Sequence, residues 1–259
     1  MLADHEHVIP INEPQIGLHL APFLSDWPGW DPPHLDETFT VNKLAEQFHI
    51  YFFSRAYERV WLPALRRLII QRIAVYGDKT KTFAIKEPNG SQAADVLSRA
   101  LPRSRILFLL RDGRDVVDSE LAAAARGSWL DRRYGGFRGI QDHERKDFVT
   151  QASWKWVWRT KVVSETIDAH AGPTRTVRYE ELLADTPGQL REIVGWLALP
   201  TAPVADIVNQ HMFNEIPNRG PREFARSASP GGWRKNLTRS EQDLVHEIMG
   251  PTLRAFDYA

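Results

Sequence analysis

Short apolar runs alternate along the chain with longer stretches of helical periodicity. The apolar runs predict buried strands over residues 82–85, 105–110 and 176–179. The periodic stretches and their capping signals predict helices over 41–76 (interrupted at Pro63), from a cap at Asn89 or Ser91 to about 101, and over 116–125, 148–169, 186–199 and 238–256. This alternation predicts an α/β fold, a parallel β-sheet flanked by helices.

Three regions lack a clear period. Residues 1–40 are rich in Pro, Asp and His, and we expect irregular structure there with at most one short helix. Residues 127–145 and 212–237 are expected to be loops. Because there is no internal repeat, low-complexity segment or linker, the pattern favours a single domain over residues 1–259.

Composition narrows the classes of function. Lys and Arg total 33, and Asp and Glu also total 33, so the net charge is zero. This balance argues against a broad nucleic-acid-binding surface, and an anionic ligand would need a local arginine cluster. The absence of cysteine excludes disulfides, thiolate catalysis and cysteine-ligated metals. Without a signal peptide or an apolar run of about 18 residues, we expect a cytoplasmic protein with no membrane span.

A dense charge cluster follows the clearest predicted strand. Residues 111–119 read R-D-G-R-D-V-V-D-S, at the end of the strand and the start of a helix. In an α/β sheet, ligands bind beyond the carboxyl ends of the strands, and a helix N-terminus there suits a phosphate. Arg111 can add a forked contact, and the Ser119 hydroxyl can reach the same anion. The alternative is a solvated charged turn with an Arg–Asp pair.

Two later segments have similar chemistry. Residues 226–236 combine glycines, cations and a tryptophan before a capped helix, and the alternative is a surface loop with a packing Trp233. Residues 177–182 form a strand that ends in Tyr179 and two acids, and the alternative is a tyrosine at the edge of the core. Each segment by itself fits both interpretations.

The three segments, in their order along the chain, resemble the sulfotransferase family that uses 3′-phosphoadenosine-5′-phosphosulfate (PAPS), particularly its bacterial and Golgi-like branch. The family pattern R-D-x-R-D-x-x-x-S matches residues 111–119, and Y-E-x-L matches 179–182. The family's R-K-G-x-x-G-x-W-K loop matches at Arg226, Gly231 and Trp233. Arg234 stands in place of the final lysine of this pattern, while Ser227 and Ala228 differ from its K-G. The resemblance extends from about residue 83 to the C-terminus.

The resemblance implies a P-loop-NTPase-like sulfotransferase fold and roles for these residues. Arg111, Ser119 and Arg226 would hold the 3′-phosphate of PAPS, or of its product PAP. Tyr179 would lie near the nucleotide. Gly231, Trp233 and Arg234 would belong to the C-terminal loop of that site.

One family element is missing from the sequence. A strand and a P-[KR]-S-G-T-[TS] loop normally grip the 5′-phosphosulfate, and no such segment occurs here. We therefore expect a chain that begins downstream of the first strand of the domain. Residues 12–14 resemble the family's E-P segment, which makes Glu13 the first candidate for general base, with His19 second. The alternative for Glu13 is a solvated acid.

Two functions follow. The first is transfer of a sulfuryl group from PAPS to a hydroxyl or amine, without a metal. The second is a catalytically inactive relative that binds PAP or serves as an interaction module. The sequence does not define the acceptor, and it leaves a homodimer open.

Overall fold

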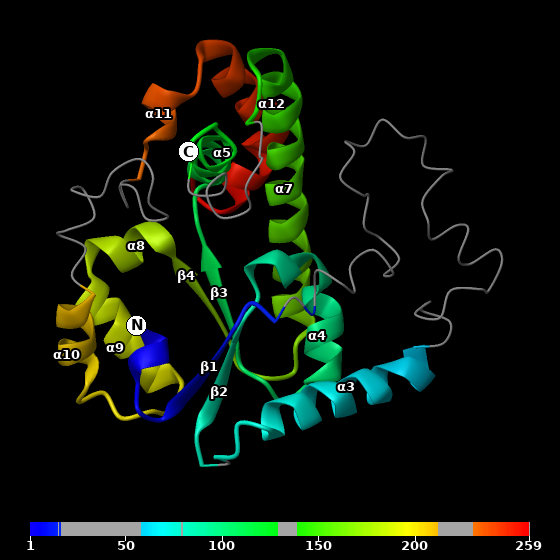
Figure 1. Ribbon diagram of the computed structural model, residues 1–259, viewed down its shortest axis with the longest axis vertical. Coiled ribbons are helices and arrows are strands. Elements are labelled where there is room, and N and C mark those ends of the chain that lie inside the picture. The colour runs from blue at the N-terminus through cyan, green and yellow to red at the C-terminus, as the bar shows by residue number, and fades with distance from the viewer. Residues whose placement is uncertain (15, 17–57, 79, 129–138, 212–229, 259) are drawn as a thin grey trace. The chain divides into compact units, whose positions relative to one another are not determined.

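The computed structural model describes residues 1–14, 16, 58–78, 80–128, 139–211 and 230–258 (Figure 1). These residues form two compact units, which are treated separately below. Unit 1 comprises Met1–Phe108, Arg159–Thr176 and Pro187–Asn209, and unit 2 comprises Leu109–Trp158, Val177–Thr186 and Gln210–Ala259.

The strands form two parallel pairs. β1 (Val8–Asn12) pairs in parallel with β2 (Thr82–Lys86), in a register that sets Val8 opposite Thr82. β3 (Ile106–Leu110) pairs with β4 (Thr174–Arg178). Ile106, the first residue of β3, donates its N–H to the carbonyl of Pro173, which directly precedes β4. Beyond the other ends of the two strands, the Asp112 N–H donates to the Glu180 side chain. Since like ends meet, β3 and β4 also run parallel, and the α/β class is confirmed.

β1 corrects the expectation of irregular structure near the N-terminus. Its sequence is V-I-P-I-N, and Pro10 lies opposite Ala84 of β2. Proline cannot donate to the ladder, so it weakens the strand signal, yet a strand with one hydrogen-bonded neighbour tolerates it. Val8 is buried, and the pairing with β2 stabilises a segment that its own sequence does not mark as a strand.

In unit 1, α3 (Glu58–Ala74) packs beside α4 (Ala94–Ala100). The predicted interruption at Pro63 is wrong: the helix continues through this residue. Pro63 lies in the second turn and removes one backbone hydrogen bond. The burial of Trp61 against Ala93 and Val96 accompanies the continuous helix.

The predicted cap of α4 is also wrong. The 3-10 helix η5 (Pro88–Ala93) precedes α4, whose N-cap is Ala93 without a side-chain cap. Ser91 instead donates its hydroxyl hydrogen to the Pro88 carbonyl.

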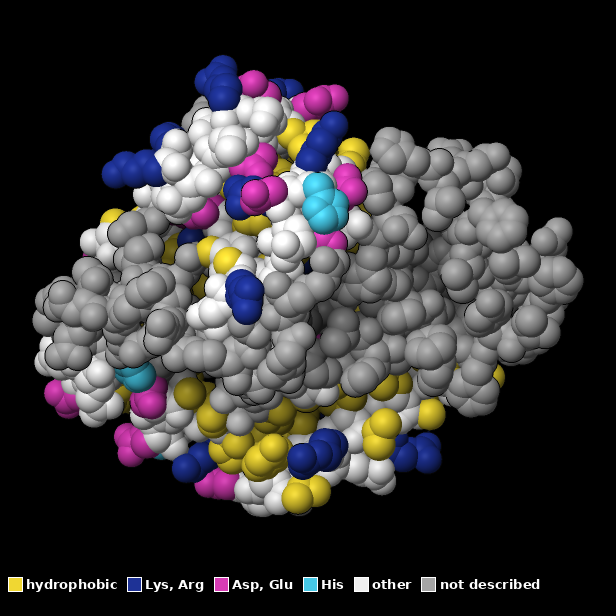
Figure 2. Space-filling view, turned by 45° about the horizontal axis from the view of Figure 1, so that its top comes forward, with side chains coloured by type: hydrophobic (Ala, Val, Ile, Leu, Met, Phe, Trp, Pro, Cys, Tyr) yellow, Lys and Arg dark blue, Asp and Glu magenta, His cyan; other side chains and the backbone are white. Residues whose placement is uncertain are grey.

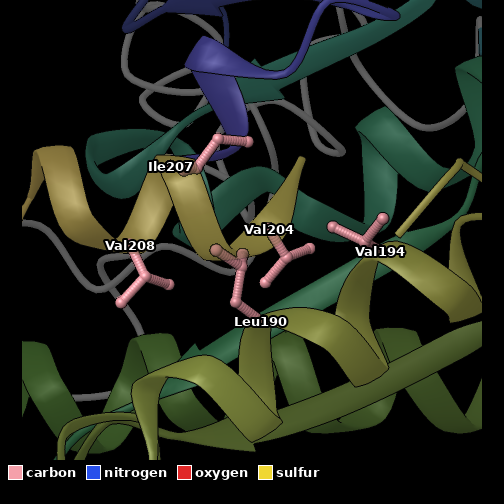
Figure 3. Close-up of a cluster of buried hydrophobic side chains, with 5 residues drawn as sticks. All are labelled: Leu190, Val194, Val204, Ile207 and Val208. Carbon is pink, nitrogen blue, oxygen red and sulfur yellow. The ribbon is translucent and has the colours of Figure 1, made fainter. Parts of the chain in front are cut away.

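A second cluster of unit 1 joins α9 (Thr186–Trp196) to α10 (Val204–Gln210), which the sequence pattern did not predict. Figure 3 shows apolar side chains of the two helices pointing toward one another. Met1 and Leu2, beside the 3-10 helix η1 (Leu2–Asp4), pack against the same cluster. The buried members are Leu190, Val194, Val204, Ile207 and Val208.

Unit 2 surrounds the carboxyl ends of β3 and β4. Its helices are α5 (Gly113–Ala123), the 3-10 helix η6 (Asp142–Glu144), the first part of α7 (Arg145–Ala169), α8 (Tyr179–Ala184), α11 (Trp233–Asn236) and α12 (Arg239–Ala255). In Figure 1, α5 follows β3 directly, and α11 and α12 lie near it.

The two predicted capping boxes have different outcomes in the structure. At α12 the capping box is confirmed, because Thr238 accepts the Glu241 N–H and Glu241 accepts the Thr238 N–H. The second predicted box differs in its position: α9 begins at Thr186 itself, and the Thr186 hydroxyl donates to the Leu182 carbonyl of α8. Both expected loops also contain short helical turns, η6 in the first and α11 in the second.

Acidic and basic side chains are interspersed over the upper part of the described surface in Figure 2. Of the helices that the structure describes, none is long and apolar enough to cross a membrane.

Candidate functional site

The charge cluster after β3 divides into groups with different partners. Asp112 is the N-cap of α5, and its carboxylate accepts hydrogen bonds from the Arg114 N–H at 2.9 Å and from the Arg114 guanidinium. The shortest contact of this ion pair, from Nη2, is 2.8 Å, and both side chains are buried. An Arg–Asp pair is therefore present, but it is not a solvated turn.

This cap bears on the prediction that the N-terminus of α5 receives a phosphate, which stays a prediction. The Asp112 carboxylate already occupies the Arg114 N–H, so this donor is not available to a phosphate. An anion at this end of β3 is therefore more favourably held by side chains that are not paired with an acid.

Of the two arginines in the segment R-D-G-R-D, Arg111 is not paired with an acid among the described residues. Its Cζ lies 4.9 Å from the ring centroid of Tyr179, the first residue of α8. Its Nε is buried, yet it has no hydrogen-bond partner among the described residues. A buried N–H of a charged group without an acceptor is unfavourable, and a bound anion would satisfy it.

Tyr179 supports the same interpretation. Burial raises the pKa of its phenol above the ordinary value of 10.0, Arg111 opposes the shift, and the charges of Glu180 and Asp115 add to it. The phenol is therefore neutral at neutral pH. It adds no negative charge beside Arg111, and its hydroxyl hydrogen can be donated to an anion.

Ser119 lies on α5 one turn beyond Asp115, on the same face of the helix. It is partly buried, and within the described part of the chain its hydroxyl forms no hydrogen bond. Arg111 and Ser119 thus both have free donor capacity.

The turn formed by Gly231 and Gly232 before α11, called the glycine turn below, is hydrogen-bonded to this face of α5. Asp115 is 2% exposed, and its carboxylate accepts the Gly231 N–H at 2.7 Å and the Trp233 N–H at 3.3 Å. Gly231 has φ +86°, a conformation that glycine adopts readily. The sequence pattern linked these segments only through the resemblance, and the contact shows that they are neighbours.

Trp233 packs in the interior, as expected in the alternative in which residues 226–236 form a surface loop with a packing tryptophan. It is 5% exposed, and the guanidinium carbons of Arg114 and Arg234 lie 4.5 and 4.6 Å from its ring. Arg234 itself is exposed and forms no ion pair with any described residue. It therefore presents a cation beside the glycine turn.

Glu180 and Tyr258 are contacts that the sequence reasoning missed. Glu180 accepts the Asp112 N–H at 2.9 Å and the Tyr258 hydroxyl at 2.8 Å. The Tyr258 carbonyl accepts a hydrogen bond from Arg114 Nη2. The centroid of the Tyr258 ring lies 4.1 Å from Cζ of Arg178. These contacts hold the backbone immediately after Arg111. No local signal could identify Tyr258, which lies 78 residues from Glu180 in the sequence.

The remaining predicted residues belong to unit 1 or lie outside the described residues. Glu13 belongs to unit 1, follows β1 with φ +49°, and forms an ion pair with Lys86 at 2.8 Å. Its side chain is 43% exposed. His19 and Arg226 lie outside the described residues.

Unit 2 thus contains donors of the types that bind phosphate: the Arg111 guanidinium in contact with the neutral Tyr179 phenol, and the Ser119 hydroxyl on α5. Among the described residues no group of three or more His, Asp or Glu is placed to hold a metal ion.

Comparison with known proteins adds one finding. The sequence matches the model of the sulfotransferase family over residues 1–203. This range includes Arg111, Ser119 and Tyr179, and it ends before the glycine turn. Searches of the curated proteins and of the solved structures find no match.

Proposed function

Because the chain belongs to the sulfotransferase family, we propose that it transfers a sulfuryl group from PAPS to a hydroxyl or amine of an acceptor. Arg111 and Ser119 would bind the 3′-phosphate of the nucleotide, and Tyr179 would lie beside it. Arg226 is assigned to the same phosphate from the family pattern. Gly231, Trp233 and Arg234 would form the adjoining turn.

The reaction is a single displacement at sulfur. The acceptor oxygen or nitrogen forms a bond to sulfur while the bond from sulfur to the 5′-phosphate oxygen breaks, and the electron pair of that bond leaves with PAP. The acceptor proton passes to a base. Glu13 is the first candidate for this base and His19 the second, because the family places a glutamate in the segment that residues 12–14 resemble.

The observation that carries the proposal is the state of Arg111. It follows β3 directly, contacts Tyr179, and has a buried Nε without a described partner. Its neighbour Arg114 has a similar position in the sequence but is neutralised by Asp112. Among the described residues at this strand end, Arg111 therefore has unused capacity for an anion.

The alternative is a relative that binds PAP without transferring sulfate. It is favoured by the absence of a P-[KR]-S-G-T-[TS] segment, because no residues are assigned to the 5′-phosphosulfate, where charge develops during transfer.

The first test is thermal unfolding with and without PAP. At 100 times its Kd, the ligand should add about 2.7 kcal/mol of stability, which corresponds to a rise in Tm of roughly 5–10 °C. Arg111→Ala should weaken PAP binding by about 1.5–3 kcal/mol. Arg103→Ala, at an exposed position of unit 1, is the matched control and should leave PAP binding unchanged. A folded wild-type protein without any PAP-dependent shift would contradict the proposal.

The second test separates the enzyme from the binding module. Labelled PAPS is incubated with the protein and a panel of hydroxyl and amine acceptors, and product formation is followed together with PAP release. Transfer that Glu13→Gln abolishes, with PAP affinity retained, is expected for the enzyme. PAP binding without transfer to any acceptor would favour the inactive relative.

A further inference from the structure

α11 receives its N-terminal cap from another helix. It has four residues, and its own N-cap, Gly232, has no side chain to accept a hydrogen bond. The N–H groups of Gly231 and Trp233 point instead to the two carboxylate oxygens of Asp115 on α5. Because so short a helix is not stable by itself, its position depends on this contact.

Asp118 provides a second attachment one turn along α5. Its Oδ2 accepts a hydrogen bond from Asn236 Nδ2 at 2.9 Å. A Cβ at Gly232 would lie only 3.2 Å from the same oxygen. Two acids of α5 thus hold both ends of the segment from Gly231 to Asn236.

The attached segment carries Arg234 to the α5 face that also bears Ser119. Asp118 and Ser119 lie three and four residues after Asp115, and residues at these spacings lie on the same face of a helix as Asp115. The Arg234 guanidinium lies over the Trp233 ring, and Trp233 is fixed by the Asp115 contact and by burial. The Asp115 carboxylate accepts two backbone N–H groups, which offset part of its negative charge beside the phosphate.

From these contacts we propose that Asp115 is a positioning residue for the nucleotide: it caps α11 in trans and so sets the preference for nucleotides that carry a 3′-phosphate. This inference rests on the proposed function, in which Arg111 and Ser119 bind that phosphate. Asp115 does not itself touch the nucleotide.

The experiment measures Kd by calorimetry for PAP and for adenosine 5′-phosphate (AMP), which lacks the 3′-phosphate. Asp115→Asn keeps the shape of the side chain, but it presents an NH₂ group to one of the two N–H donors. We expect the PAP-over-AMP preference to fall about tenfold, through weaker PAP binding with AMP binding little changed. A general loss of folding would instead weaken both nucleotides together.

Two further variants make the test decisive. Glu120→Gln removes an acid of α5 that pairs with Lys155 and should leave the preference unchanged. Asn236→Ala removes only the exposed contact to Asp118 and should lower the preference about two- to threefold, which provides a test even if Asp115→Asn does not fold.

The outcomes separate the inference from the proposed function. A folded Asp115→Asn protein with the wild-type preference would overturn the inference. If that variant does not fold, an unchanged preference in Asn236→Ala would show that the attachment of the Gly231–Asn236 segment to α5 does not affect the phosphate, and this would overturn the premise of the inference. A wild-type protein that binds PAP no better than AMP would refute the 3′-phosphate site itself, and with it the proposed function.

Discussion

Four charged residues within five positions have different roles at the end of β3. Asp112 and Arg114 neutralise each other in a buried pair, Asp115 holds the glycine turn, and Arg111 keeps unused donor capacity. The two arginines have the same chemistry, and so do the two aspartates, so the different roles within each pair follow from the groups that surround each side chain. Only Arg111 has the properties expected of a ligand-binding residue.

The first prediction concerns Gly113, which lies between the paired residues Asp112 and Arg114. A Cβ at Gly113 would lie 2.5 Å from Cδ2 of Trp156 and 2.8 Å from Sδ of Met249. Gly113→Ala should therefore lower the free energy of unfolding by about 1–3 kcal/mol, although alanine favours the helix. Urea denaturation measures this difference.

Gly195→Ala is the matched control for Gly113. Gly195 lies on α9, is exposed, and has no atom within 4 Å of the position of a Cβ. This variant should be more stable than the wild type by about 0.5–1 kcal/mol. Equal stability changes in the two variants would mean that the close approach of α5 to Trp156 is absent.

At the scale of elements, α12 shows how a local signal and a distant partner combine. Thr238 and Glu241 form the capping box that the sequence predicts, and Glu241 also accepts two hydrogen bonds from Arg145 of α7. Burial alone would raise the pKa of Glu241. The hydrogen bonds from Arg145 and Thr238 outweigh burial and lower the pKa below its ordinary value of 4.5.

A pH dependence of stability follows. Because the folded-state pKa of Glu241 is depressed, its stabilising contribution is complete above about pH 4.5 and is lost as the pH falls through the folded-state pKa. Glu241→Gln should cost about 1–2 kcal/mol at pH 7, and its difference from the wild type should shrink below pH 4.5. Urea denaturation at pH 7, 5, 4 and 3 measures the trend.

Glu247→Gln, at an exposed position of the same helix, serves as the control. It should differ little from the wild type at every pH. A cost of Glu241→Gln that stays constant down to pH 3 would contradict the lowered pKa.

At the scale of the whole molecule, residues far apart in the sequence meet around Arg111. Tyr258 donates its hydroxyl hydrogen to Glu180, which in turn holds the backbone at Asp112. Burial and the hydrogen bond to Glu180 raise the pKa of the Tyr258 phenol far above its ordinary value, so the hydroxyl remains a donor throughout the neutral range.

Tyr258→Phe removes this hydroxyl without changing the ring beside Arg178. The free energy of unfolding should fall by about 1–2 kcal/mol, because Glu180 loses a hydrogen bond in a buried setting. Tyr76→Phe, at a tyrosine 43% exposed, is the control and should be neutral. If both variants unfold at the same urea concentration as the wild type, the contribution of the Tyr258 contact is negligible.

The sequence by itself determined the elements with strong local signals. The β2 and β3 strands, the helix α7 and the capping box of α12 are confirmed, because their apolar periods and caps involve residues close in the chain. The order of three motifs also indicated the sulfotransferase family, which the family match confirms. By contrast, β1 and α10 were missed, and Pro63 was taken for a helix break. Pairing with β2 and packing between helices decided these cases.

Only the tertiary structure decided the roles of the charged residues. The segment R-D-G-R-D contains two similar Arg–Asp steps, and apart from the family pattern nothing local distinguishes Arg111 from Arg114 or Asp112 from Asp115. Their partners Tyr179, Tyr258 and Gly231 come from segments 68 to 144 residues away. The free energy of a buried charge depends on the groups that surround it, and folding brings those groups together.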